Sequence, residues 1–216
     1  MIKRIALVGT AAVLAMSFAM AAVANARPSR HRHHVVPTHA ASSQPDQVIK
    51  WNQELQKVLV APGAQPASIH PTRTMAITQI AVYDAVTGIL GHGQPFLVHV
   101  RGPRFASPEA AAASAARTAL DALLPSQQPT IDAFFQSSLA QIGSGFRVDL
   151  GIAFGRRVAN AVLANRAQDR ANQPAPVFTP FTGPGEYQLT APTFAPAGFT
   201  QTANVRPFVL RDASQF

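Results

Sequence analysis

The stretch HPTRTMAITQIAVYDAVTGIL, residues 70–90, decides the fold of this chain. It predicts one long helix, because Thr72 offers a capping hydroxyl at its start and Gly88 and Gly91 stand at its end. Between these ends, side chains recur on one face at helical spacing: Ile77, Ile80, Ala81, Asp84 and Ala85. The length and the apolar face indicate a central helix of a larger all-α core.

Two opposite charges lie on one side of this helix. Arg73 precedes Asp84 by three helical turns, so the two side chains project in the same direction. A buried charge is costly unless it is paired and hydrogen-bonded. We therefore expect each of the two to meet an opposite charge or a backbone group inside the helical body.

Four more helices are predicted around it, over residues 46–59, 110–124, 130–142 and 148–170. Asp46 and Ser107-Pro108-Glu109 are typical helix starts. Gly151, Gly155 and Ala159 recur every four residues and leave a groove for a neighbouring backbone. Apolar faces on two of these helices are formed by Val48, Trp51, Leu55, Val58, Leu59, Phe134, Phe135, Leu139 and Ile142. Residues 46–170 are thus predicted to be a helical domain.

The amino-acid composition changes in residues 171–216. Prolines exclude a regular helix there: Pro174, Pro176, Pro180, Pro184, Pro192, Pro196 and Pro207. Aromatic side chains between them are unusual for a disordered tract: Tyr187, Phe194, Phe199 and Phe208. We therefore expect an extended Pro-rich segment that lies over the helical body as a strap.

The N-terminus has the pattern of a secretory signal peptide. Lys3-Arg4 is followed by an apolar stretch over residues 5–22 and by the small-x-small site Ala24-Asn25-Ala26. We expect residues 1–26 to be cleaved after Ala26, which places the protein in the periplasm or outside the cell with no stable membrane span. An uncleaved N-terminal anchor is the alternative.

Residues 27–45 form a His- and Arg-rich tail without helical or strand periodicity, and we expect it to be disordered. Its histidines could bind zinc or copper opportunistically, but a solvated tail is favoured because no ordered element fixes their geometry: His31, His33, His34 and His39.

Composition excludes two classes of function. The formal charge is +8, but five of the 18 Lys and Arg residues lie in the first 32 positions. The remaining 13 face 10 acidic residues, an excess of three, so nucleic-acid binding is not expected. The chain has no cysteine, which excludes disulfides and thiolate metal sites.

The order of several motifs resembles the N-terminal half of bacterial vanadium-dependent haloperoxidases, which belong to the phosphatidic acid phosphatase type 2 superfamily. The resemblance covers about residues 48–216. It rests on Trp51-Asn52, Arg73-Thr-Met-Ala-Ile77, Ile80-Ala-Val-Tyr-Asp-Ala-Val86, the Ala-rich helix from Ala110 to Leu124, Gly151-x-x-x-Gly155-x-x-Val158-Ala159, Arg166-Ala167-x-Asp169 and Pro184-Gly185-x-Tyr187. Gln94-Pro95-Phe96 is a looser match, and Tyr187 stands where the family has tryptophan.

The resemblance implies a chemistry whose residues this chain lacks. The family holds vanadate with a lysine, arginines and a Ser-Gly-His element, a second histidine bonds the metal, and peroxide then oxidises halide. Here no lysine follows Lys57, no histidine follows His99 and no Ser-Gly-His triplet occurs. His92 and His99 stand in a loop with no carboxylate neighbour to orient them. We therefore assign no catalytic, cofactor-binding or metal-binding residue.

Three hypotheses follow. The chain is expected to be a truncated or fragmentary member of the haloperoxidase and acid phosphatase superfamily, inactive alone because the vanadate-binding half is missing. It could instead pair with a separate second half, or be an exported helical binding protein. A half-bundle would expose apolar helix faces, so we expect the missing catalytic half or a second copy to cover them. Whether a complete version would act as a peroxidase or a phosphatase stays open.

Overall fold

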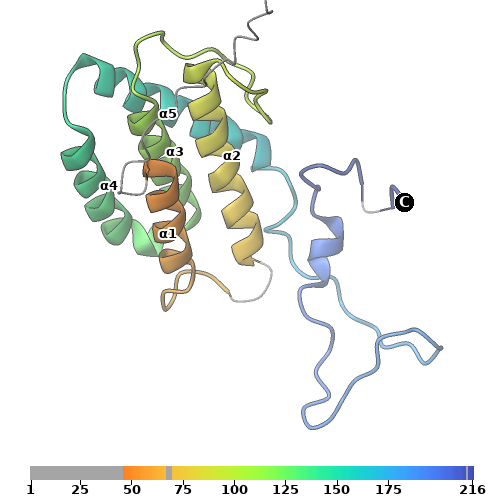
Figure 1. Cartoon of the computed structure of the whole chain (residues 1–216). Coiled ribbons are helices and arrows are strands. Elements are labelled where there is room, and N and C mark those ends of the chain that lie inside the picture. Colours follow the sequence, from red (N-terminus) through yellow and green to blue (C-terminus); the bar gives the residue numbers. More distant parts are fainter. Residues whose placement is uncertain (1–45, 67–69, 213) are drawn as a thin grey trace, which may run out of the picture. The chain divides into compact units, whose positions relative to one another are not determined.

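The fold is all-α, as predicted. The computed structural model describes residues 46–66, 70–212 and 214–216, which belong to one unit. These residues contain no strand, and their helices are α1 (Gln47–Leu59), α2 (His70–Leu90), α3 (Pro108–Leu123), η1 (Pro125–Gln127), α4 (Gln128–Ile142), α5 (Phe146–Arg166) and η2 (Thr200–Asn204) (Figure 1). None of these helices has the length and apolar character to cross a membrane. The expected signal peptide and His-rich tail lie outside the described residues.

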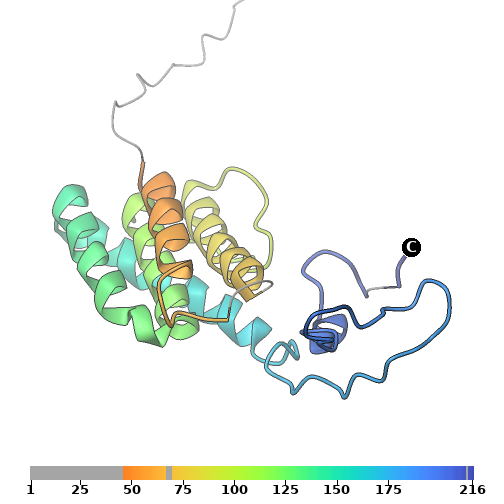
Figure 2. The same cartoon turned by 90° about the horizontal axis from the view of Figure 1, so that it is seen from below.

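Helix α3 lies at the centre of the bundle and packs against α1, α2, α4 and α5 (Figure 2). Its buried side chains are mostly alanines, which allow neighbouring helices to approach on every side. The sequence predicted this central place for residues 70–90. Helix α2 does contribute to the core through Ile77, Ala81 and Ala85, each of which is fully buried.

The predicted glycine groove is confirmed at the contact between α5 and α3. A Cβ atom on Gly151 would lie 2.4 Å from the carbonyl oxygen of Ser107. One on Gly155 would lie 2.2 Å from the carbonyl oxygen of Ala111. Real Cβ atoms do not come this close to an oxygen, so the two helices touch backbone to backbone at these glycines.

Two predicted helix starts are confirmed and one is wrong. The side chain of Asp46 accepts a hydrogen bond from the backbone N–H of Ile49, and that of Ser107 accepts one from Ala110. Thr72 is not the N-cap of α2, because the helix begins two residues earlier at His70. Thr72 therefore lies in the first helical turn.

The two glycines near the end of α2 play different roles. Gly91 ends the helix in the left-handed region, with a φ of +68°, and its N–H donates to the carbonyl oxygen of Thr87. Gly88 lies inside the helix, where a Cβ would be 2.9 Å from both the Phe154 ring and the carbonyl oxygen of Val100. Its small size therefore lets a loop and α5 pack on α2.

Several boundaries and buried positions differ from the prediction. Helix α4 begins at Gln128 rather than at residue 130, because Pro129 fits the first turn. Helix α5 runs from Phe146 to Arg166, not over residues 148–170. Val48 was expected in the core, but its side chain is 38% exposed, and Gln47 and Glu54 are buried beside Trp51 instead.

Residues 171–212 and 214–216 contain no α-helix, as the prolines predicted. Most side chains before residue 197 in this segment are exposed. Contacts with the helices are concentrated in residues 199–208, where Phe199 packs on His70 and Phe208 packs on the core. The extended strap over the helical body stays a prediction.

Candidate functional site

A cluster of buried charges joins three distant parts of the chain. Asp169 is its centre: Arg73 donates to Asp169 Oδ2 from Nε over 2.8 Å, and Arg166 does so over 3.1 Å. Only 2% of the Asp169 side chain and 4% of the Arg166 side chain are exposed. Arg73 therefore has the opposite charge that its position on an apolar helix predicted.

The geometry of the cluster follows from the way α5 ends. Arg166 is the last helical residue, and Asp169 lies one turn further along the chain. The N–H of Ala171 donates to Asp169 Oδ1, and Arg170 adopts a left-handed φ of +71°. These features turn the chain away from the helix axis, which explains why α5 stops before residue 170. Arg73 Nη2 also donates to the carbonyl oxygen of Arg166.

The same cluster anchors the C-terminal segment. Arg166 donates to the backbone carbonyl oxygens of Arg206 and Pro207, and its guanidinium lies 4.0 Å from the centre of the Phe208 ring. The N–H of Arg206 in turn donates to the carbonyl oxygen of Asp169 over 2.9 Å. Residues 206–208 are thus fixed to the C-terminal end of α5 and the residues just after it.

The charges in the cluster compensate for burial. Burial by itself raises the pKa of Asp169, but hydrogen bonds from Arg73 and the Ala171 N–H, with the charges of Arg73 and Arg166, bring that pKa below its ordinary value. Burial lowers the pKa of Arg166, and the charge of Asp169 opposes this. The depressed pKa of Asp169 means that its contribution to stability is present above the unfolded value and is lost as the pH falls through the folded one.

The second charge on α2 binds backbone rather than a cation. Asp84 is fully buried, and its carboxylate accepts N–H hydrogen bonds from Phe96 over 2.6 Å, Leu97 over 2.9 Å and Val98 over 2.8 Å. Asp84 thereby fixes the loop after α2. Arg73 and Asp84 share a helix but bind different segments, so they form no common site.

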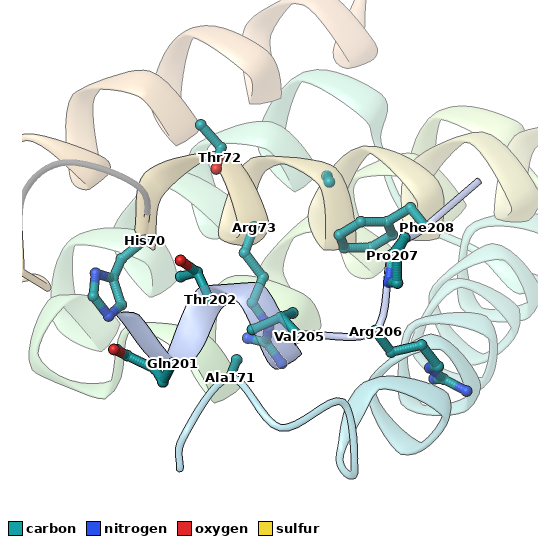
Figure 3. A pocket seen from close by; sticks show the side chains of 11 residues that line it. His70, Thr72, Arg73, Ala171, Gln201, Thr202, Val205, Arg206, Pro207 and Phe208 are labelled. Atoms are coloured by element: carbon teal, nitrogen blue, oxygen red, sulfur yellow. The ribbon is translucent and has the colours of Figure 1, made fainter. Parts of the chain in front are cut away.

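A cavity of about 380 Å³ opens beside the arginine cluster (Figure 3). It lies between the first turns of α2 and residues 201–208. Its lining is mostly apolar: Ala76, Ala171, Val205, Pro207 and Phe208. The polar residues around it are His70, Thr72, Arg73, Gln201, Thr202 and Arg206. No pattern in the sequence indicates this cavity, because its two walls are far apart in the chain.

The described residues do not fit a vanadate site. An oxyanion of this kind needs several converging cationic donors. The Arg166 donors are used by Asp169 and by carbonyl oxygens, and Arg73 also gives its Nε–H to Asp169, so the two guanidinium groups do not converge on one free anion position. His92 and His99 are both exposed in the loop after α2, away from this cluster. Within the part of the chain that the structure describes, no three His, Asp or Glu side chains converge to hold a metal ion.

Trp51 is a core residue, as its place on an apolar helix face predicted. Its side chain is 1% exposed, and its ring meets the Phe134 ring edge to face with centres 4.9 Å apart.

The sequence analysis did not predict one further group of charged side chains, which lies between α3 and α4. Arg117 on α3 pairs with Asp132 on α4 over 2.6 Å and with Asp121, one turn along α3, over 3.4 Å. Burial raises the pKa of Asp121 to about 6; the charge of Arg117 lowers it and that of Asp132 raises it further. The spacing of Arg117 and Asp121 was a usable signal, whereas Asp132 is brought close only by the packing of α4.

Comparisons of the chain with protein-family models, with curated proteins and with solved structures gave no match. Support for a function therefore comes from the sequence resemblance and from the fold and contacts described above.

Proposed function

We propose that this chain is a non-catalytic helical module, related to the N-terminal half of haloperoxidase-like proteins, that docks onto a catalytic half carrying the vanadate-binding residues. The proposal rests on the sequence resemblance together with one structural observation. The charged residues that belong to the resemblance, Arg73, Asp84, Arg166 and Asp169, use their hydrogen bonds to fix the module's own backbone. Such residues support a fold rather than a reaction.

An apolar groove on the outer side of α2 supports the docking half of the proposal. We call it the α2 groove, a hollow of about 620 Å³ lined by Gln79, Ile80, Tyr83, Gln94, Pro95, Phe96 and His99. Tyr83 is 46% exposed and Phe96 is 44% exposed. Exposed aromatic side chains framed by polar residues are typical of an interface core with a polar rim. A helix with an apolar face, from the second half, is the partner that such a groove fits.

The first test is enzymatic. The full chain, expressed with its own N-terminus, is assayed for bromination of an organic acceptor with vanadate, peroxide and bromide. We expect no vanadate-dependent turnover, because no set of converging cations and histidine is assembled among the described residues. Turnover that disappears in a His92→Ala, His99→Ala double variant would show that the loop after α2 holds a catalytic site, and the proposal would be wrong.

The second test identifies the partner. A photo-crosslinking phenylalanine derivative is placed at Phe96 in the α2 groove and, as a matched control, at Phe105, which is 63% exposed outside it. In cells that make the protein, irradiation should join position 96 to a polypeptide with a Ser-Gly-His element and should leave position 105 without that product. A crosslink from position 96 only to a second copy of this chain would instead support a homo-oligomer.

A further inference from the structure

We propose that the cavity between α2 and residues 201–208 binds a small organic acid, a molecule with one carboxylate and an apolar body. The site shares no residue with the α2 groove, so the inference does not depend on the proposed docking. Figure 3 shows His70 and Gln201 at one end of the cavity, Phe208 at the other and Arg73 between them.

The size and lining of the cavity determine which apolar part a ligand can have. Its volume of about 380 Å³ lies within the range of small-molecule sites in proteins. Val205, Pro207 and Phe208 present apolar surface from one wall, and Ala76 presents it from α2. An inorganic anion would leave this surface in contact with water. A chain of several methylene groups or an aromatic ring would cover it.

The charges beside the cavity determine which polar head group the ligand can have. Two arginines, Arg73 and Arg166, pair with one carboxylate, Asp169, and the charge of Arg206 acts on Arg166, so the cluster carries an excess of positive charge. Each guanidinium nitrogen of Arg166 already donates a hydrogen bond, and Arg206 is turned toward Asn165. In Arg73, Nε and one N–H of Nη2 are used, while neither N–H of Nη1 makes a hydrogen bond to a described residue. A carboxylate is the group that these N–H donors fit best.

Two other polar atoms at the cavity have no hydrogen-bond partner among the described residues. They are Nδ1 of the His70 imidazole and Oε1 of the Gln201 side chain, and both are buried. A buried polar atom without a partner is costly. Both residues line the cavity, so a rotation of either side chain that turned its unpaired atom toward a bound polar group or a water molecule would relieve this cost.

The test uses octanoate as the acid, octanamide as its neutral counterpart and inorganic phosphate as the bare anion. Each is titrated calorimetrically into the full chain. Octanoate should bind saturably and more weakly as salt is added, and phosphate should bind far less. Octanamide should bind about tenfold more weakly, since it cannot form the charge-assisted hydrogen bond. Octanoate that gives no saturable binding at millimolar concentration, or octanamide that binds equally well, would overturn the proposal.

Variants locate the binding. Ala76→Leu extends a side chain from α2 into the cavity and should abolish octanoate binding without touching a charge. Ala133→Leu makes the same change at an exposed position of α4 and should leave binding intact. The helical content of both variants is checked by circular dichroism. Unchanged binding in a folded Ala76→Leu variant would place the acid elsewhere and refute this site. If the Ala76→Leu protein did not fold, octanoate-induced chemical-shift changes confined to α2 and residues 201–208 of the unmodified chain would decide, and changes elsewhere would refute the site.

Discussion

Replacement of Asp84 tests the loop anchor most directly. Asp84 holds three backbone N–H groups while fully buried, and no other described side chain accepts these hydrogen bonds. A hydrogen bond to a charged group contributes about 1.5–3 kcal/mol, so three would give roughly 5–9 kcal/mol. Phe96 is 44% exposed, so water can reach part of the freed backbone. We therefore expect Asp84→Ala to lower the free energy of unfolding by about 3–4 kcal/mol.

The Asn variant sharpens this test. In Asp84→Asn the amide oxygen can take the place of Oδ2, which accepts from Leu97 and Val98, but the NH₂ group then faces the N–H of Phe96. The expected loss is intermediate, about 1.5–2 kcal/mol. Urea unfolding followed by far-UV circular dichroism gives both values, provided that the m-value is unchanged.

A control variant and a local measurement distinguish loss of the Asp84 hydrogen bonds from a general effect of removing a carboxylate. Glu186→Ala removes an exposed carboxylate from a loop and should change the stability by less than about 0.5 kcal/mol. Amide exchange should quicken at Phe96, Leu97 and Val98 in Asp84→Ala before the helices lose protection. A loss below about 1 kcal/mol, with unchanged exchange at these amides, would refute the anchoring role.

Two more predictions concern packing and pH. Gly155→Ala should cost about 3 kcal/mol in thermal or urea unfolding, because its Cβ would lie 2.2 Å from the Ala111 carbonyl oxygen. Gly198→Ala, where a Cβ meets nothing within 4 Å, should be neutral, and equal effects would mean that the α3–α5 contact is looser than described. Burial raises the pKa of Asp121 to about 6, so the carboxyl is favoured in its protonated form and its stabilising contribution is lost as the pH rises from about 4 to about 6. Asp121→Asn should flatten that part of the stability–pH curve, and a carboxyl NMR titration with a midpoint near 4 would contradict the assignment.

Local signals predicted what local interactions determine. Asp46 and Ser107 were recognisable as caps because a helix start is decided within four residues. The pattern Gly151-x-x-x-Gly155 predicted a close backbone contact, since only the absence of a side chain was needed. The end of α5 was missed because Asp169 is pulled out of the helix by Arg73, which lies 96 residues earlier in the chain. No window of sequence contains that interaction.

The candidate site was harder to predict than the fold. The sequence indicated that Arg73 would meet an opposite charge or a backbone group, but not that its partner would be Asp169. The sequence also offered no reason to expect a cavity. His70 and Phe208 line the same cavity only because residues 206–208 pack on the end of α5. Sites assembled from distant segments depend on tertiary packing, which periodicity does not record.

Arg166 holds the C-terminal segment through main-chain oxygen atoms, those of residues 206 and 207. A backbone carbonyl oxygen is common to all twenty amino acids, so these contacts fix where the segment lies without requiring particular side chains in it. As far as this contact is concerned, we expect position 207 to tolerate substitutions that keep its backbone path. We do not expect position 166 to tolerate even lysine, because lysine lacks the planar fork of donors that reaches an aspartate and two carbonyl groups together. Among related chains, we therefore expect the residue at the end of α5 to be more conserved than the residues of the C-terminal segment whose backbone it binds.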